Sequence, residues 1–314
     1  MTERRAPTQP QIEAARERLA DVLVRTPLVP FPGVDDLWLK PEIHQPGGCF
    51  KVRGVHNALL CMDPERRAQG VSTVSAGNTA KALAWSARRF GVEARSLMPE
   101  HAPHTKVEAM RALGGTPVLV PVEEVFAFLR EERWHAEPYA FVHPWFDRDL
   151  LAGHGTLGAE IALELPEVDS VFVPVGGGGL LGGVGSALRA WKPDVRIYAV
   201  EPAGCPSLSA AIDAGRPVDV ACETMCDGVA VPYVTDEMFG LLRELADRVV
   251  LVEESDVRAA IRRLAAKAHV VAEGAGALAF AAACSIPAEE RGRSVCLVTG
   301  GSIDTAKLLD VLSE

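Results

Sequence analysis

The hydrophobic pattern of the chain becomes regular from about Val71 onward, where short apolar runs rich in β-branched residues alternate with longer amphipathic segments. Short apolar runs are typical of buried strands, and apolar residues recurring every three to four positions are typical of helices. The alternation predicts parallel sheets covered by helices, the α/β class. The first series contains expected strands at residues 71–74, 94–98, 117–120 and 140–142, and expected helices at residues 78–90 and 106–113.

A second series of the same kind follows the first, which indicates two lobes. Its expected strands lie at residues 170–175, 196–200, 249–252 and 295–298. The chain of 314 residues also exceeds the length, about 250 to 300 residues, at which a single core stops growing. We therefore expect a large domain of residues 1–67 and 146–314 and a small domain of residues 68–145. The crossings are expected at residues 146–149 and in HQPGG before Lys51.

Composition restricts the class of ligand. The chain is 48% hydrophobic and 24% charged, and it has no apolar run long enough to cross a bilayer. Its net charge of −10 argues against a nucleic-acid partner, because phosphate backbones bind basic surfaces. The N-terminal segment lacks the apolar core of a secretory signal, which predicts a cytoplasmic location. The expected partner is a small molecule.

The cysteines and histidines do not suggest a metal site. The seven cysteines lack CxxC spacing, and we expect them to be reduced and mostly buried as small hydrophobic residues. His101 and His104 lie in EHAPHTK, with a proline between them and no third ligand nearby. A surface loop is the expected role of that segment.

The most specific local pattern is SVFVPVGGGGLLGGVGSALRAW, where an expected strand ends at Val175, four glycines follow, and a helix begins at about Leu180. Glycines let backbone N–H groups approach an anion closely, and a helix N-terminus carries a partial positive charge. The pattern indicates a phosphate cradle at residues 176–179, with a plain tight turn as the alternative. A dinucleotide site is disfavoured, because the acidic residue expected about 20 residues later comes late, at Glu201.

A second pattern is KPEIHQPGGCFKVRG, in which Lys51 follows a loop rich in proline and glycine. A lysine alone indicates little, because most lysines lie at the surface. The stretch from Cys49 to Gly54, however, resembles the Ser-Phe-Lys-x-Arg-Gly segment of fold-type II enzymes, the tryptophan-synthase-β-like family that uses pyridoxal 5'-phosphate (PLP). The resemblance implies that Lys51 is the catalytic residue and holds PLP as a Schiff base. Cys49 replaces the family's serine, and we expect weaker local hydrogen bonding there.

The resemblance extends over nearly the whole chain in the family's order. It implies two lobes, each an open, mostly parallel sheet flanked by helices. Taken alone, SAGNTAK would be interpreted as a helix cap. The resemblance implies instead a loop that grips the substrate carboxylate, with Asn78 beside the phenolic oxygen of the cofactor. The residues of this loop are Ser75, Ala76, Gly77, Asn78 and Thr79. The implied cofactor contacts are Lys51, Phe50, Asn78, Gly176, Gly177, Gly178, Gly179, Leu180, Glu273 and Thr299.

Three acidic or hydroxyl positions carry further implications. Thr299 in LVTGGSID falls where the family places a Ser or Thr against the pyridine nitrogen, although a strand-end hydroxyl in a turn is the simpler interpretation. Glu273 matches a family Glu near the cofactor, but Gly274 replaces the usual Pro, so its role stays open. Some relatives bind a divalent cation through a Glu at the position of Glu201 and an Asp six residues later. Ser207 stands at that later position, and one carboxylate is a poor cage for such an ion.

The segments AGHGT at residues 152–156 and CDGVAV at residues 226–231 resemble the serine/threonine dehydratase branch. They imply β-elimination of a 3-hydroxy amino acid such as L-threonine or L-serine to a 2-keto acid and ammonia, in a homodimer. The alternatives are an amino-acid racemase, a β-replacement enzyme, a dehydratase for a bulkier 3-hydroxy amino acid and a non-catalytic ligand sensor. The family's racemases carry a serine at the position of Ala76. A methyl group cannot carry a proton, which favours elimination.

Overall fold

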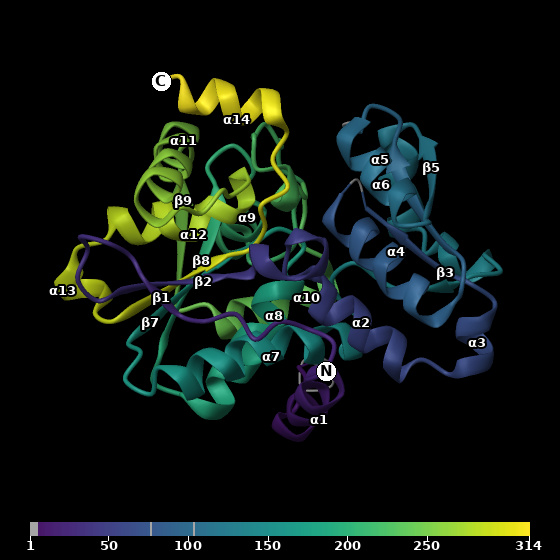
Figure 1. The fold of residues 1–314 in the computed structure, drawn as a ribbon, viewed down its shortest axis with the longest axis horizontal. Coiled ribbons are helices and arrows are strands. Elements are labelled where there is room, and N and C mark those ends of the chain that lie inside the picture. The colour runs from purple at the N-terminus through teal and green to yellow at the C-terminus, as the bar shows by residue number, and fades with distance from the viewer. Residues whose placement is uncertain (1–5, 76, 103) are drawn as a thin grey trace.

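The computed structural model describes residues 6–75, 77–102 and 104–314, and within these ranges the strands form two open sheets (Figure 1). The larger sheet has the order β1-β2-β10-β7-β8-β9, and its neighbouring strands are parallel except for β1 and β2. Its strands are β1 (Val29–Pro30), β2 (Leu37–Pro41), β7 (Ser170–Pro174), β8 (Arg196–Pro202), β9 (Arg248–Val252) and β10 (Ser294–Val298).

The smaller sheet has the order β5-β4-β3-β6, with parallel pairing along its described strands. Its strands are β3 (Val71–Val74), β4 (Ala94–Pro99), β5 (Thr116–Val120) and β6 (Ala140–Phe141). Every residue of β3 is buried, as expected for a parallel strand that helices cover on both faces. Because the strands are parallel, their carboxyl ends lie at the same edge of the sheet. Ligands of open α/β sheets usually bind at this edge.

Helices connect the strands and cover both sheets. In Figure 1, α4, α5 and α6 lie with the smaller sheet at the right, and α2 runs between this group and the rest of the molecule. Helix α7 packs against α8 and α2, and α12 contacts β7 to β10 of the larger sheet. The helices are α1 (Gln9–Leu19), α2 (Lys51–Cys61), α3 (Pro64–Ala68), α4 (Asn78–Phe90), α5 (His104–Ala112), α6 (Val122–Arg130), α7 (Arg148–Glu164), α8 (Gly179–Trp191), α9 (Ser207–Ala214), α10 (Asp236–Leu245), α11 (Glu254–Arg263), α12 (Gly274–Ser285), α13 (Ala288–Arg291) and α14 (Thr305–Leu312). Short helical turns are η2 (Glu42–His44), η3 (Pro46–Gly48), η4 (Arg133–Ala136), η5 (Asp227–Val229) and η6 (Leu264–Ala268).

The α/β class and the two mostly parallel sheets confirm the fold expected from the sequence. The expected strands and helices lie within two residues of the observed ones, and the helix at residues 78–90 is α4. Strand β2 was not expected, because Lys40 and Pro41 interrupt its apolar run. Lys40 is nevertheless fully buried, since its Nζ donates to the carbonyl of Thr26 at 2.6 Å and pairs with Glu160 at 2.9 Å. The domain boundaries at residues 67/68 and 145/146 stay a prediction.

The cysteines differ from the expectation of reduced thiols. Cys205 and Cys222 form a disulfide with a Cα–Cα distance of 4.3 Å. The chain after α9 returns alongside the start of that helix, where the amide of Glu223 donates to the carbonyl of Gly204 at 2.9 Å, and this return brings the two sulfurs together. The free cysteines are Cys49, Cys226 and Cys296, which are buried, and Cys61 and Cys284, which are exposed. No helix in the described ranges is both long and apolar enough to cross a membrane.

Arg53 of the CFKVRG segment lies at the centre of a buried ionic cluster. Its Nε donates to Glu42 at 2.6 Å and its Nη1 to Glu160 at 2.7 Å, and its side chain is 2% exposed. Burial acts to lower the pKa of Arg53, but the carboxylates of Glu42 and Glu160 raise it above its usual value. The cluster joins α2 to α7 and to the segment after β2, so it fixes the start of α2, where Lys51 lies.

Arg53→Met should lower the free energy of unfolding by about 3–5 kcal/mol, because it leaves the buried carboxylate of Glu42 without a positive partner, whereas Glu160 keeps Lys40. Urea unfolding of the purified variant measures this loss. The matched control is Arg133→Met, since Arg133 also pairs with two carboxylates, those of Glu124 and Glu131, but at the surface. Exposed pairs contribute little, so the control should lose much less stability. Equal losses in both variants would show that the Arg53 cluster does not stabilise the fold.

Candidate active site

A cavity of about 560 Å³ lies between the two groups of elements and collects most residues expected from the sequence. This volume is within the usual range for small-molecule sites. Its lining includes Phe50, Lys51, Ser75, Gly77, Asn78, Thr79, Gly176, Gly177, Gly178, Gly179, Leu180, Glu273 and Thr299. Ala76 lies outside the described residues. The structure thus brings together residues that are more than 200 positions apart in the sequence.

Lys51 is the first residue of α2 and lines this cavity from a partly buried position. Burial lowers the pKa of Lys51 to about 8, although Cys49 and Glu273 act in the opposite direction. The amide of Phe50 donates to the carbonyl of Thr299 at 3.0 Å, which ties the start of α2 to the end of β10. A lysine in this setting is a better nucleophile at neutral pH than a solvated one.

The glycine segment connects β7 to α8 and lines the same cavity. Gly178 adopts φ of +90°, a conformation that favours glycine, and Gly179 begins the helix. The first hydrogen bond of the helix runs from the amide of Gly182 to the carbonyl of Gly178 at 2.8 Å. Amides of the first turn, including that of the buried Leu180, therefore have no partner within the helix and can bind an anion.

Close packing also explains why this segment consists of glycines. A Cβ at Gly177 would overlap the indole ring of Trp145, and one at Gly178 would overlap Leu242. A Cβ at Gly176 would lie 2.8 Å from the Cα of Val229. The sequence had suggested that side chains here would exclude the phosphate. The structure shows that they would first collide with the protein behind the loop.

Asn78, the first residue of α4, and Glu273, just before α12, line the cavity and contact each other. The Nδ2 of Asn78 donates to Glu273 at 2.6 Å, and burial raises the pKa of Glu273. The Oδ1 of Asn78 and the Oε2 of Glu273 are buried without a hydrogen-bond partner among the described residues. The helix-cap interpretation was wrong, because the cap position is Gly77 and no side chain caps the helix. The side chain of Asn78 is instead available to the cavity.

The other expected residues complete the walls. The amide of Gly77 donates to the Oγ of Ser75 at 3.1 Å, and Thr79 is buried in the first turn of α4. Thr299 follows β10 and is buried, and its hydroxyl donates to the carbonyl of Ala275 at 3.2 Å. Phe50 packs on His154, with the two ring centroids 4.9 Å apart. The cavity therefore combines an amine, a row of amides, a hydroxyl at a strand end and two unpaired polar oxygens.

Comparison with known proteins shows the family to which the chain belongs. The family model described as "Pyridoxal-phosphate dependent enzyme" matches residues 19–300 of the chain. The chain belongs to this family. It is 38% identical to the L-threonine ammonia-lyase of Geobacter sulfurreducens, over an alignment that covers 96% of this chain and 77% of the relative.

Two solved structures share the fold of this chain. The structure of maize serine racemase has a TM-score of 0.90 and 29% identity, covering 98% of this chain and 97% of that chain. The structure of the T.th. threonine deaminase has a TM-score of 0.86 and 31% identity, covering 95% of this chain and 99% of that chain. These similarities confirm the tryptophan-synthase-β-like fold and the expectation of an enzyme that uses PLP.

The residues present fit PLP. The glycine segment and the first turn of α8 offer amide donors for a phosphate, and a Cβ would disturb that segment at Gly176, Gly177 and Gly178. The unpaired oxygens of Asn78 and Glu273 are buried and require polar partners, which a cofactor ring can supply. The Lys51 amine lies in the same cavity. The glycine segment would hold the phosphate, Asn78 and Glu273 the ring, and Lys51 the aldehyde carbon.

The pKa of Lys51 predicts how fast the apoenzyme captures PLP. Only the uncharged amine attacks an aldehyde, so the rate should rise with pH to a plateau above about 8. Stopped-flow absorbance of apoenzyme mixed with PLP measures this rate. Free Nα-acetyl-lysine, whose amine has a pKa of about 10.4, is the control and should show a rate that still rises beyond pH 9. A midpoint near that of the free amine would show that Lys51 is not desolvated.

The carboxylate of Glu201 is engaged in hydrogen bonds to the start of α9. Its carboxylate accepts the amides of Leu208 at 2.7 Å and Ser209 at 2.9 Å, and the hydroxyl of Ser207 at 3.3 Å. Burial raises the pKa of Glu201 to about 7. The described residues contain no group of three or more His, Cys, Asp or Glu side chains that could hold a metal ion. The hydrogen bonds of Glu201 hold the start of α9.

Sequence reasoning missed the structural roles of three residues near the site. Trp145 packs on the glycine segment, and Lys106 of α5 forms an ion pair with Asp227 of η5 at the edge of the cavity. His154, the His of AGHGT, is fully buried, and burial holds its pKa well below the usual value. Trp145 and Lys106 have no local sequence signal, and the AGHGT segment does not reveal that His154 packs on Phe50, because each residue acquires its role from an element distant in the chain.

Proposed function

We propose that the chain is an ammonia-lyase that converts a 3-hydroxy amino acid, L-threonine or L-serine, to a 2-keto acid and ammonia. The observation that carries this proposal is the neutral hydroxyl of Thr299 at the end of β10, in the same cavity as Lys51. A neutral hydroxyl cannot protonate a pyridine nitrogen, which favours elimination over transamination. The similarity to the L-threonine ammonia-lyase of Geobacter sulfurreducens supports the same reaction.

The residues have the following proposed roles. PLP, when bound, withdraws electrons from the amino acid that it holds. The Nζ of Lys51 then removes the proton from the substrate Cα, a step for which its lowered pKa is suited. The hydroxyl of Ser75, whose Oγ accepts the amide of Gly77, lies near the start of α4, where it donates its own hydrogen to the substrate carboxylate and orients it. Asn78 and Glu273, which are hydrogen-bonded to each other, position the ring through their unpaired oxygens.

A substrate panel tests the proposal. The holoenzyme is incubated with L-threonine, L-serine and a 3-hydroxy amino acid with a phenyl side chain, and the 2-keto acid is measured by its hydrazone. Release from L-threonine or L-serine supports the proposal. Exclusive turnover of the phenyl substrate would assign the bulkier substrate class instead. A protein without bound PLP or turnover would indicate a ligand sensor.

Racemisation is a second candidate, because the maize serine racemase structure is so similar. Inversion needs an acid on the cofactor face opposite Lys51, and Ala76 cannot provide one. Incubation with L-serine should therefore form pyruvate much faster than it forms D-serine. Chiral chromatography measures the D-serine, and the pyruvate is followed in the same samples. D-serine formed as fast as pyruvate would favour the racemase.

Thr299→Asp should slow 2-keto acid release and produce a new long-wavelength absorption band with substrate. A carboxylic acid at this position can give the ring nitrogen a proton, which stabilises negative charge on the ring and delays loss of the β-hydroxyl. Absorption spectra and steady-state rates measure both effects. The isosteric Thr299→Val removes the hydroxyl without adding an acid, so it should not produce the band. An unchanged spectrum and rate in Thr299→Asp would place Thr299 away from the ring.

We further propose that the enzyme is a cytoplasmic homodimer that forms a Schiff base at Lys51. Light scattering after size-exclusion chromatography tests the dimer, and cell fractionation tests the location. A monomer in solution would contradict the first proposal.

A further inference from the structure

The substrate of the proposed lyase carries a carboxylate into the cavity, and the loop at the start of α4 offers that carboxylate few donors. The amide of Gly77 already donates to the Oγ of Ser75 at 3.1 Å, so it is used within the loop. The hydroxyl of Ser75 is a donor, but it carries no charge. A carboxylate that leaves water loses much hydration free energy unless a positive group lies beside it. The loop therefore needs a cation from another element.

Lys106 of α5 is a cation that lies on this loop. Its Cδ is 3.1 Å and its Nζ 3.5 Å from the position that a Cβ on Gly77 would take. Its side chain is 11% exposed, whereas His101 and Lys307, which also border the cavity, are exposed. Burial raises the pKa of Glu273, and the ammonium group of Lys106 acts in the opposite direction. The charge of Lys106 therefore reaches into the cavity beside the carboxylate loop.

Lys106 is held by a carboxylate that a ligand can replace. Its Nζ donates to the Oδ2 of Asp227 in η5. The side chain of Asp227 is 36% exposed, so water can solvate this carboxylate when Lys106 turns away. An ion pair with a partly solvated member contributes little net stability. The exchange of Asp227 for another carboxylate is therefore inexpensive in free energy.

We propose that Lys106 is a substrate-binding residue whose ammonium group exchanges Asp227 for the carboxylate of the 3-hydroxy amino acid. This inference rests on the proposed function and adds the positive partner of its substrate. The exchange makes and breaks only an ion pair, and the substrate carboxylate is bound beside the hydroxyl of Ser75. Because the carboxylate takes no part in the elimination, Lys106 should affect KM more than kcat.

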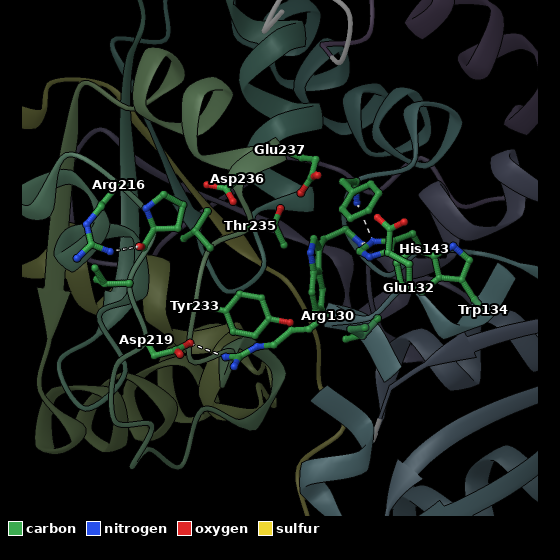
Figure 2. Close-up of a pocket in the computed structure, with 16 residues that line it drawn as sticks. Arg130, Glu132, Trp134, His143, Arg216, Asp219, Tyr233, Thr235, Asp236 and Glu237 are labelled. Carbon is green, nitrogen blue, oxygen red and sulfur yellow. Dashed lines mark hydrogen bonds and ion pairs between the residues drawn. The ribbon is translucent and has the colours of Figure 1, made fainter. Parts of the chain in front are cut away.

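A second ion pair joins the same parts of the molecule and provides the matched control. Arg130 of α6 pairs with Asp219 at 2.5 Å (Figure 2). Like the Lys106–Asp227 pair, it connects a helix beside the smaller sheet to the chain between α9 and α10. Neither Arg130 nor Asp219 lines the cavity that contains Lys106. Arg130→Gln thus breaks an ion pair of the same kind without touching the carboxylate loop.

The probe is 3-hydroxybutanoate, which has the carboxylate and the hydroxyl of threonine but no amino group, so it cannot form an imine with the cofactor. Calorimetric titration of the holoenzyme measures its affinity. Lys106→Gln should weaken binding about tenfold, because a charge-assisted hydrogen bond is lost. Asp227→Asn should instead tighten binding about threefold, because the competing carboxylate is gone. Lys106→Arg keeps the charge and should bind within about threefold of the parent, and Arg130→Gln should bind like the parent.

Two further comparisons isolate the contact between Lys106 and the carboxylate. In the Lys106→Gln background, Asp227→Asn should no longer tighten binding, because the group for which the two carboxylates compete is absent. 3-Hydroxybutanamide, in which a neutral amide replaces the carboxylate, should bind the parent and Lys106→Gln equally. In steady-state assays, the KM for L-threonine should rise about tenfold in Lys106→Gln, with kcat within about threefold of the parent.

The sign of the Asp227→Asn effect decides the proposal. Weaker binding in Lys106→Gln and tighter binding in Asp227→Asn, with Arg130→Gln unchanged, support it. Weaker or unchanged binding in Asp227→Asn would overturn it, because the ion pair would then act only as a structural link. Unchanged binding in Lys106→Gln, or no saturable binding to the parent, would overturn it as well. The Asp227→Asn result stands even if Lys106→Gln does not fold.

The titration also separates this inference from the proposed lyase activity, because it requires no turnover. A holoenzyme that binds the probe with the expected shifts but releases no 2-keto acid would contradict the lyase activity and support the role of Lys106. Release of 2-keto acid with the same probe affinity in the parent and Lys106→Gln would do the reverse.

Discussion

Lys51→Ala should abolish turnover, with a loss of at least on the order of 10³-fold in kcat, and should leave PLP bound only reversibly. The amine is both the group that attaches to the cofactor and the base that reaches the substrate Cα, and Lys106 at the edge of the cavity is held in an ion pair with Asp227. Steady-state assays and absorption spectra of the dialysed protein measure both losses.

Chemical labelling tests the same assignment independently of activity. Borohydride reduction of the holoenzyme followed by peptide mapping should place the cofactor on Lys51. Lys267→Ala, which removes an exposed lysine between α11 and α12, is the control and should retain full activity and label. A label on any lysine other than Lys51 would refute the assignment.

Gly177→Val should lose PLP almost completely, even if the protein still folds. A Cβ at Gly177 overlaps the ring of Trp145, so the segment must move out of its position and carry its amide donors with it. Cofactor content, measured by absorbance after dialysis, and the melting temperature together separate loss of PLP from unfolding.

Two further variants identify the cause of that loss. Gly33→Val introduces strain at a φ of +76° in an open surface position, and it should retain PLP. Gly177→Ala combined with Trp145→Ala should bind PLP more tightly than Gly177→Ala alone, because the smaller residue leaves room for the new methyl group. Absence of this rescue would mean that the side chain excludes the phosphate directly. Normal cofactor content in Gly177→Val would place the phosphate elsewhere.

The contrast between Asn78 and β2 shows where local patterns fail. SAGNTAK has the composition of a helix cap, and α4 does begin there, yet the cap position is Gly77. The side chain of Asn78 instead donates to Glu273, which lies at the start of the distant helix α12. Strand β2 was not expected, because its buried Lys40 depends on partners outside the strand, the carboxylates of Glu160 and Glu164 from α7. In both cases the deciding partner lies far away in the sequence.

The sequence by itself determined the periodic strands and helices, the glycine segment after β7 and the lysine after the loop rich in proline and glycine, because these depend on backbone geometry and on the spacing of apolar residues. Tertiary structure alone decided which polar groups face one another. It paired Cys205 with Cys222, enclosed Arg53 between Glu42 and Glu160, and placed Trp145 behind the glycine segment. The physical reason is that burial, hydrogen-bond partners and pKa values depend on distances between elements, and no local pattern encodes those distances.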